Sequence, residues 1–236
     1  MFDIVHDVLL DIWKKGIMSL YTTEIQNLVN CALQELASEH KTGKVVDAPV
    51  SNNHYLVRWV TRAIKSQRFH RCVQGDLIRW QKEGRSKGNN AALMNTFQRI
   101  AKFYADFLPL NSAHRQIKDH EINDFLDFME EQGWEVSTSE PLINCGKVQI
   151  FTEGPNSFAL CSKQCDDCFD GEDLVKPMSW FVRGNHALFI EKAANAGFML
   201  HKITDYKSNV KYHGEYLVYP ANQGEQLAEI PIGYPL

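Results

Sequence analysis

Residues 145–168 read CGKVQIFTEGPNSFALCSKQCDDC, and this stretch contains four of the six cysteines in the chain. The last three follow the spacing C-x3-C-x2-C, which brings thiolates together on one tight loop. A fourth thiolate from a preceding strand completes the tetrahedral shell that zinc prefers. We therefore predict a structural zinc site that braces the C-terminal half of the protein. Its four ligands are Cys145, Cys161, Cys165 and Cys168.

Two other interpretations of these cysteines stay open. Reduced thiols without a metal are common in a reducing compartment, and the same spacing also suits a redox or iron–sulfur role. A catalytic zinc of the deaminase type does not fit, because that chemistry uses H-x-E followed by P-C-x-x-C. Cys165-Asp166-Asp167-Cys168 has neither the proline nor the H-x-E.

Short strand-like runs surround the cysteines. Residues 148–152 and 157–160 bracket a Gly-Pro turn, and residues 199–206 and 211–219 read as a hairpin. These runs predict a small, mainly antiparallel sheet.

A helix followed by a glycine, an aromatic residue and a strand occurs twice, 64 residues apart. The first helix ends at Gly133 before Trp134, and the second ends at Gly197 before Phe198. Glycine at this position adopts the left-handed conformation that stops a helix. The pattern is compatible with a structural duplication or with a cap shared by unrelated helices.

The N-terminal part of the chain predicts a bundle of helices, because apolar residues recur there at helical spacing up to Pro109. We therefore expect an α+β protein, in which an all-helical domain over 1–110 precedes an α+β domain over 111–236. The helices are expected over Phe2–Trp13, from Thr23, from Asn52 or Asn53, over Asp76–Lys82 up to Gly84, and from Asn90.

Charge is distributed unevenly along the chain. The net charge is −4, but residues 58–87 contain nine Lys and Arg against two acidic residues. This segment carries +7 and the remainder −11, and such asymmetry indicates a polyanionic partner. The residues expected to contact phosphates are Arg58, Arg62, Lys65, Arg79, Lys82, Arg85 and Lys87.

Residues 79–90 combine four cations, two glycines and a helix start, and we interpret them as a cradle for an anion. Trp80 fits either as a base-stacking residue or as a core residue. The cradle is not a Walker loop, because Gly88 is followed by Asn89 rather than by lysine. A solvated helix face beside a mobile loop, or a contact with an acidic protein surface, explains the same charges.

Three residues of the predicted hairpin are candidates for a hydrolase or transferase site. His201 and Asp205 share a strand face under regular alternation, and His213 lies on the partner strand. No nucleophile motif accompanies them.

The composition, 44% hydrophobic and 23% charged over 236 residues, is typical of a globular protein. No apolar run approaches the roughly 20 residues that cross a bilayer, and no export signal is present, so we expect a cytoplasmic location. The sequence favours a non-enzymatic, zinc-stabilised accessory or regulatory protein that binds nucleic acid. The alternatives are a protein-interaction module that regulates or inhibits a larger complex through its acidic half or its tyrosines, and the hydrolase or transferase above.

Overall fold

A computed structural model describes residues 20–109, 114–138, 142–144, 147–148, 150, 152–207 and 212–236. The helix predicted over Phe2–Trp13 and the proposed ligand Cys145 lie outside these residues. The chain divides into two compact units. The helical unit is Met1–His114 with Glu225–Leu227 and Pro235–Leu236, and the sheet unit is Arg115–Gly224 with Ala228–Tyr234.

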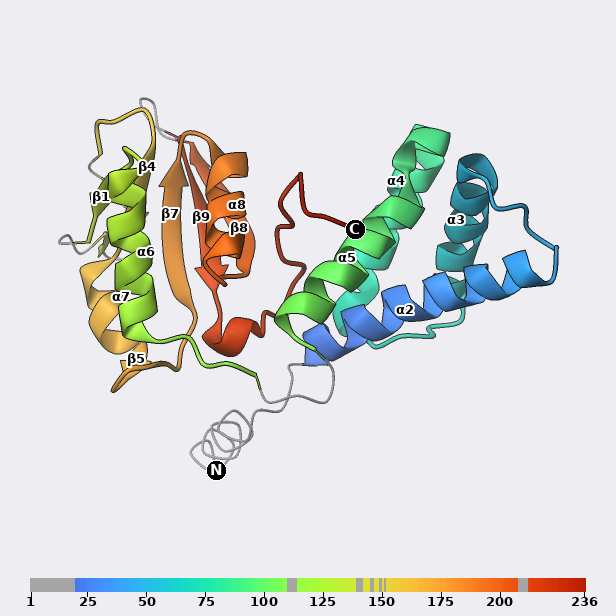
Figure 1. The fold of residues 1–236 in the computed structure, drawn as a ribbon, viewed down its shortest axis with the longest axis horizontal. Coiled ribbons are helices and arrows are strands. Elements are labelled where there is room, and N and C mark those ends of the chain that lie inside the picture. The colour runs from blue at the N-terminus through green and yellow to red at the C-terminus, as the bar shows by residue number, and fades with distance from the viewer. Residues whose placement is uncertain are drawn as a thin grey trace. The chain divides into compact units, whose positions relative to one another are not determined.

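The helical unit contains the helices labelled α2 to α5 in Figure 1, coloured from blue to green. Its helices are α2 (Leu20–Lys41), α3 (Pro49–Lys65), α4 (Gln74–Lys87) and α5 (Leu93–Phe107), with short 3-10 turns at Arg71–Val73 and Gly88–Ala91. Trp59, Trp80 and Phe97 are fully buried, and the Trp80 and Phe97 ring centroids lie 4.7 Å apart. No helix in the described part of the chain combines the length and apolarity needed to cross a bilayer.

Several helix ends differ from the sequence prediction. Thr23 lies within α2, and α3 begins at Pro49 with Ala48 as its N-cap rather than at Asn52 or Asn53. α4 does not end at Gly84 but continues to Lys87. α5 is not capped by Asn90, because Ala92 precedes its first residue in the left-handed conformation. The capping role belongs to the buried Asn53, whose Oδ1 accepts from the Leu93 backbone N–H at 3.1 Å. The Asn53 amide also donates to the Gly88 carbonyl at 2.7 Å, so this side chain fixes the α4–α5 connection.

The sheet unit is built on a five-stranded sheet with the order β1-β4-β7-β9-β8. β1 is parallel to β4, and all other pairs in this sheet are antiparallel. The prediction of an α+β protein with a mainly antiparallel sheet is therefore confirmed. The elements are α6 (Asp119–Glu131), β1 (Glu135–Ser137), β2 (Ile143–Asn144), β3 (Lys147–Val148), β4 (Ser157–Leu160), α7 (Ser162–Asp167), β5 (Phe169–Asp170), β6 (Asp173–Leu174), β7 (Met178–Arg183), α8 (His186–Asn195), β8 (Leu200–Lys207), β9 (Tyr212–Val218) and a 3-10 turn at Pro220–Asn222.

An aromatic core lies between this sheet and the helices α6 and α8, which cover the same sheet face (Figure 1). Phe125 of α6 stacks on Trp180 of β7 with ring centroids 5.4 Å apart and planes 13° apart. Phe158, Phe189 and Phe198 complete the cluster. Burying this much aromatic surface is the main source of stability for so small a sheet.

The two predicted glycine stops are confirmed. Gly133 and Gly197 have φ of +79° and +92°. Beyond each glycine the backbone N–H of the aromatic residue closes the helix by donating to a carbonyl five residues earlier. Trp134 donates to the Met129 carbonyl at 3.0 Å, and Phe198 donates to the Ala193 carbonyl at 2.9 Å. The strands that follow reach opposite sheet edges, β1 parallel and β8 antiparallel to their neighbours. The repeated pattern therefore reflects a shared cap.

Candidate nucleic-acid interface

All nine basic side chains between Arg58 and Lys87 are exposed. Three of them have carboxylate partners: Arg68 with Glu35 at 2.6 Å, Arg79 with Asp76 at 2.8 Å, and Lys87 with Glu83 at 3.7 Å. Within the described residues the other six have no ion pair. These are Arg58, Arg62, Lys65, Arg71, Lys82 and Arg85.

Two contacts fix how α3 and α4 pack. Gly84 of α4 lies directly against Val57, so that a Cβ atom at Gly84 would collide with the Val57 methyl groups. One turn further along α3, the Thr61 hydroxyl accepts from the Gln81 amide at 3.1 Å. From the first contact to the second, the residue number rises from 57 to 61 on α3 and falls from 84 to 81 on α4, so the two helices are antiparallel. The missing side chain at Gly84 is what permits the close approach.

Each helix of this pair exposes one stripe. Arg58, Arg62 and Lys65 follow the i, i+4, i+7 spacing on α3, opposite its buried face. On α4 the same spacing joins the exposed Ile78 to Lys82 and Arg85. Both helices bury their other side in the unit, so the two stripes lie side by side on the same surface. We call the five cations Arg58, Arg62, Lys65, Lys82 and Arg85 the basic face.

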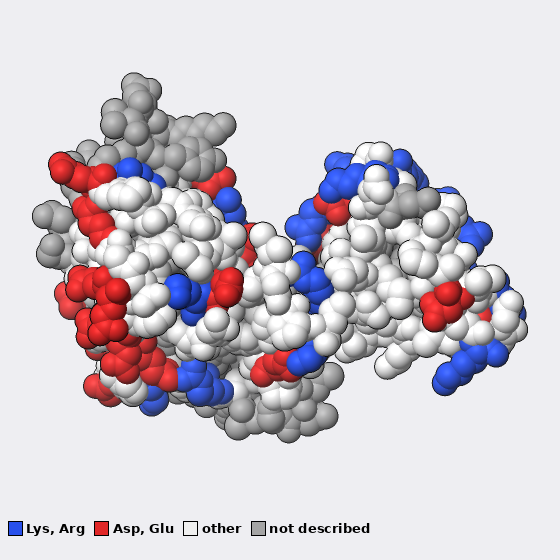
Figure 2. All heavy atoms as spheres, turned by 45° about the horizontal axis from the view of Figure 1, so that its top comes forward, with Lys and Arg blue, Asp and Glu red and all other residues white. Residues whose placement is uncertain are grey.

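The two units differ in charge, as Figure 2 shows: Lys and Arg side chains spread over the helical unit, whereas Asp and Glu gather on a flank of the sheet unit. Residues 20–109 of the helical unit contain 13 Lys and Arg against 7 Asp and Glu, whereas Arg115–Gly224 of the sheet unit contains 10 against 17. The positive potential of the basic face is therefore not cancelled by acidic residues of its own unit.

A groove of about 470 Å³ adjoins the basic face. Arg58 and Arg62 line it together with Lys44 from the loop before α3, a residue that nothing in the sequence marked as part of the site. Burial and the nearby Glu35 carboxylate raise the pKa of Tyr55, which also lines the groove, so its phenol stays neutral. The Arg62 guanidinium carbon lies 6.0 Å from the Tyr55 ring centroid.

The predicted cradle over residues 79–90 is not formed. Trp80 is 1% exposed and belongs to the core, so it does not stack on a base. Gly84 approaches α3 rather than a ligand. Arg79 is held by Asp76, a carboxylate that also accepts from the Tyr21 hydroxyl at 2.7 Å. Of the predicted phosphate contacts, Arg79 and Lys87 are engaged in ion pairs, and the other five form the basic face.

Of the three described cysteines of the predicted zinc site, Cys165 and Cys168 belong to one apolar cluster and Cys161 to another. Cys161 is buried with Ala159 and Phe181, whereas Cys168 belongs to the core beneath α6, with Cys165 packed against it. Burial raises the pKa of Cys165 to about 11, and the nearby Asp119 and Asp166 carboxylates, followed by the thiols of Cys161 and Cys168, add to this effect. Across the residues that the structure describes, no group of three or more His, Cys, Asp or Glu side chains is placed to hold a metal ion. The zinc site, whose ligand Cys145 lies outside those residues, stays a prediction.

The prediction that His201 and Asp205 share a strand face is wrong. A β-bulge between Lys202 and Thr204 inserts Ile203 as an extra residue and reverses the alternation. His201 is therefore opposite Leu217 on one face, whereas Asp205 is opposite Gly214 on the other.

His213, the third candidate residue, is buried. It is 3% exposed, and its Nε2 lies 3.2 Å from the Thr152 hydroxyl and 3.3 Å from the Ser157 hydroxyl. Asp205 pairs instead with Lys202 at 3.0 Å. The three candidate residues of the hydrolase or transferase hypothesis are thus not brought together.

The fold and this surface define a two-unit α+β protein with a basic helical face. The chain belongs to the family described as "Protein of unknown function (DUF2913)", which matches residues 20–231 and so spans both units. Comparison with curated proteins and with solved structures found no match.

Proposed function

We propose that the helical unit binds the phosphate backbone of a nucleic acid through the basic face, and that the protein is a non-enzymatic accessory or regulatory factor. The observation that supports this most directly is the juxtaposition of two exposed stripes whose five cations have no ion pair within the described residues. Cations that are not paired with a carboxylate can replace the counterions condensed on a polyanion, which is the main driving force of such binding.

The dimensions of the basic face suit a phosphate backbone. Seven residues of helix rise by about 10 Å, and packed helices lie about 8–10 Å apart. An array of this size meets several successive phosphates, which are about 3.4 Å apart along the axis of a duplex strand. A contact of this kind holds the backbone without reading the bases.

The aromatic residues of α3 and α4 support the same conclusion. Tyr55, Trp59 and Trp80 are all buried in the helical unit. Base stacking, which strengthens binding to single strands, has no exposed aromatic partner among them. We therefore expect duplex binding with little sequence preference.

Substitution of single cations tests this proposal. Arg58→Ala and Lys82→Ala each remove one unpaired cation of the basic face. Lys102→Ala is the matched control, because Lys102 belongs to the same unit but donates to Asp106 at 2.7 Å. Binding to a labelled 20-base-pair duplex is followed by fluorescence anisotropy at several salt concentrations.

The expected result is a loss of affinity in both variants, together with a drop of about 0.9 in the magnitude of the salt slope for each lost phosphate contact. The Lys102 variant should bind like the wild type. An equal effect of all three substitutions would reduce the proposal to general charge attraction. A wild-type protein that does not bind at low salt would contradict it, and the acidic protein surface would then be the partner to pursue.

A further inference from the structure

The outer face of α6 is strongly acidic. The helix contains six carboxylates and no Lys or Arg over its 13 residues. These residues are Asp119, Glu121, Asp124, Asp127, Glu130 and Glu131. They add to the negative charge of the sheet unit, in which 17 carboxylates outnumber 10 cations over Arg115–Gly224. A surface of this charge repels nucleic acid and attracts basic partners.

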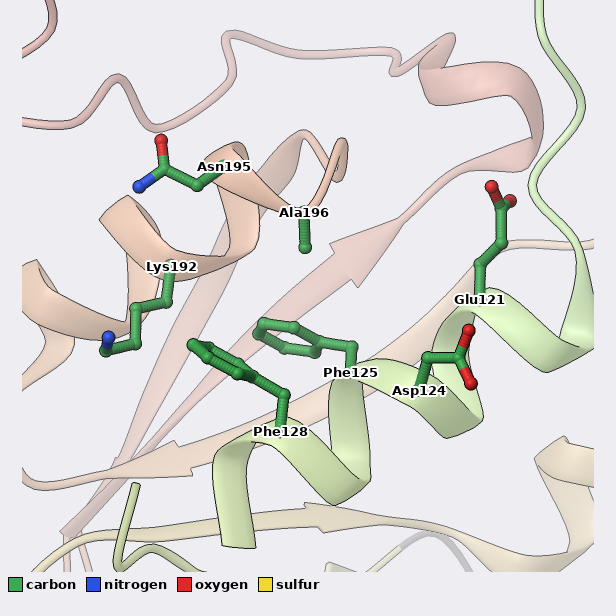
Figure 3. Close-up of a pocket in the computed structure, with 7 residues that line it drawn as sticks. All are labelled: Glu121, Asp124, Phe125, Phe128, Lys192, Asn195 and Ala196. Carbon is green, nitrogen blue, oxygen red and sulfur yellow. The ribbon is translucent and has the colours of Figure 1, made fainter. Parts of the chain in front are cut away.

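A groove of about 420 Å³ runs between α6 and α8 (Figure 3). Its apolar part consists of Phe125, Phe128 and Ala196. Phe128 is 37% exposed, although it is a large aromatic residue, and its ring centroid lies 6.3 Å from that of the buried Phe125. The Phe125 ring is itself held by the aromatic core, so the groove has a preformed apolar floor.

Charged side chains lie at both ends of the groove, on either side of its apolar residues. The Lys192 ammonium lies 4.9 Å from the centre of the Phe128 ring, which shows that this ring face accepts a cation. Glu121 and Asp124 lie toward the other end, near Ala196 (Figure 3). Glu121 is already engaged, because it pairs with Arg115 and accepts from the backbone of Lys118. Asp124 is exposed and has no ion pair in the described part of the chain.

We propose that this groove docks a basic amphipathic helix of a partner protein. One large apolar side chain of that helix lies on Phe125 and Phe128, and a neighbouring Lys or Arg pairs with Asp124. The exposed carboxylates further along α6, Asp127, Glu130 and Glu131, face the other cations of the partner. An apolar anchor flanked by complementary charges is a recurring way for a helix to bind a groove.

The groove lies entirely within the sheet unit, so its occupation does not depend on the basic face. A designed 14-residue peptide with leucine and lysine at helical spacing is the probe, labelled and titrated with the full-length protein at moderate salt. One control peptide replaces every lysine with glutamate. A second has the same composition without an amphipathic face.

Paired substitutions locate the binding. Phe128→Ala removes the exposed anchor, and Ile203→Ala, at another exposed apolar residue of the same unit, is its control. Asp124→Lys reverses the unpaired charge, and Asp167→Lys does the same at an exposed carboxylate outside the groove. We expect Phe128→Ala and Asp124→Lys to weaken peptide binding about tenfold or more, with both controls within twofold of the wild type.

Four results would overturn the proposal. Equal losses in the groove variants and their controls would mean unspecific attraction to an acidic surface. If the glutamate peptide binds as tightly as the lysine peptide, the groove does not select a basic partner. Concentration-dependent self-association that disappears in Phe128→Ala would assign the groove to a second copy of this chain. Spermidine binding with the same sensitivity to Asp124→Lys would assign it to a small cation.

Discussion

Replacing Gly84 with alanine tests the packing of α3 against α4, on which the basic face depends. The added methyl group would collide with the methyl groups of Val57. Valine has one strongly preferred rotamer in a helix, so Val57 cannot easily turn away. The backbone of one helix would have to shift instead.

The expected magnitude follows from two opposing effects. Overpacking of this kind costs about 1–3 kcal/mol, whereas alanine in a helix interior is about 1 kcal/mol more favourable than glycine. Gly84→Ala should therefore leave stability unchanged or lower it by up to about 2 kcal/mol. In a Val57→Ala background the collision is absent, and the same substitution should raise stability by about 1 kcal/mol.

A double-mutant cycle measures the difference between these two backgrounds. The four proteins are unfolded in urea, and hydrogen exchange of α3 and α4 peptides assigns the change to the helical unit. The cycle should give a coupling energy of about 1–3 kcal/mol between residues 57 and 84. If Gly84→Ala stabilises the protein by about 1 kcal/mol in both backgrounds, the two helices do not meet at Gly84 and the described surface is incorrect.

Three further predictions concern the sheet unit. Burial lowers the pKa of His186 below its ordinary 6.5, so the unfolded chain binds the proton more tightly and stability should fall as the pH drops below 6.5 through the folded pKa. In pH-dependent urea unfolding, His186→Gln should flatten this fall, and an unchanged pH dependence in this variant would contradict the prediction. Elemental analysis tests the zinc prediction, which expects one zinc ion per chain, lost in Cys145→Ser and kept in Cys72→Ser. Asn222→Ala should cost about 2–4 kcal/mol in urea unfolding, because this buried amide bridges a backbone N–H and a carbonyl.

The features that the sequence predicted well are set by local chemistry. The stripe of Arg58, Arg62 and Lys65 follows from helical periodicity, which places these residues opposite the buried face of α3. The stops at Gly133 and Gly197 follow from the conformational freedom of glycine. Neither inference requires knowledge of a distant contact.

Helix ends that depend on distant residues were not predictable in this way. Gly84 has the local pattern of a helix stop, but it packs against Val57 inside α4, and the glycine with positive φ that ends this helix is Gly88. The start of α5 is capped by Asn53, a side chain 40 residues earlier in the chain. A cap supplied from that far away leaves no signal in the residues that flank the helix.

The register of β8 and the role of the cysteines depend on tertiary packing in the same way. The bulge lies at Ile203, and neither this residue nor its neighbours is a glycine or proline that would mark a bulge in the sequence. Regular alternation therefore placed His201 and Asp205 on one face. The cysteine spacing is compatible with metal ligands or with core residues. Spacing alone does not show which way a thiol faces, and in the fold Cys161 and Cys168 belong to different apolar clusters.

The salt dependence of duplex binding tests the proposed function most directly. If all five cations of the basic face contact phosphates, the slope of log Kobs against log salt concentration should be about −4.5, since each contact contributes about −0.9. Affinity for a 20-base-pair duplex should then fall roughly 500-fold between 50 and 200 mM salt. A slope near zero, or no binding at the lower salt concentration, would contradict the proposal that this surface binds nucleic acid.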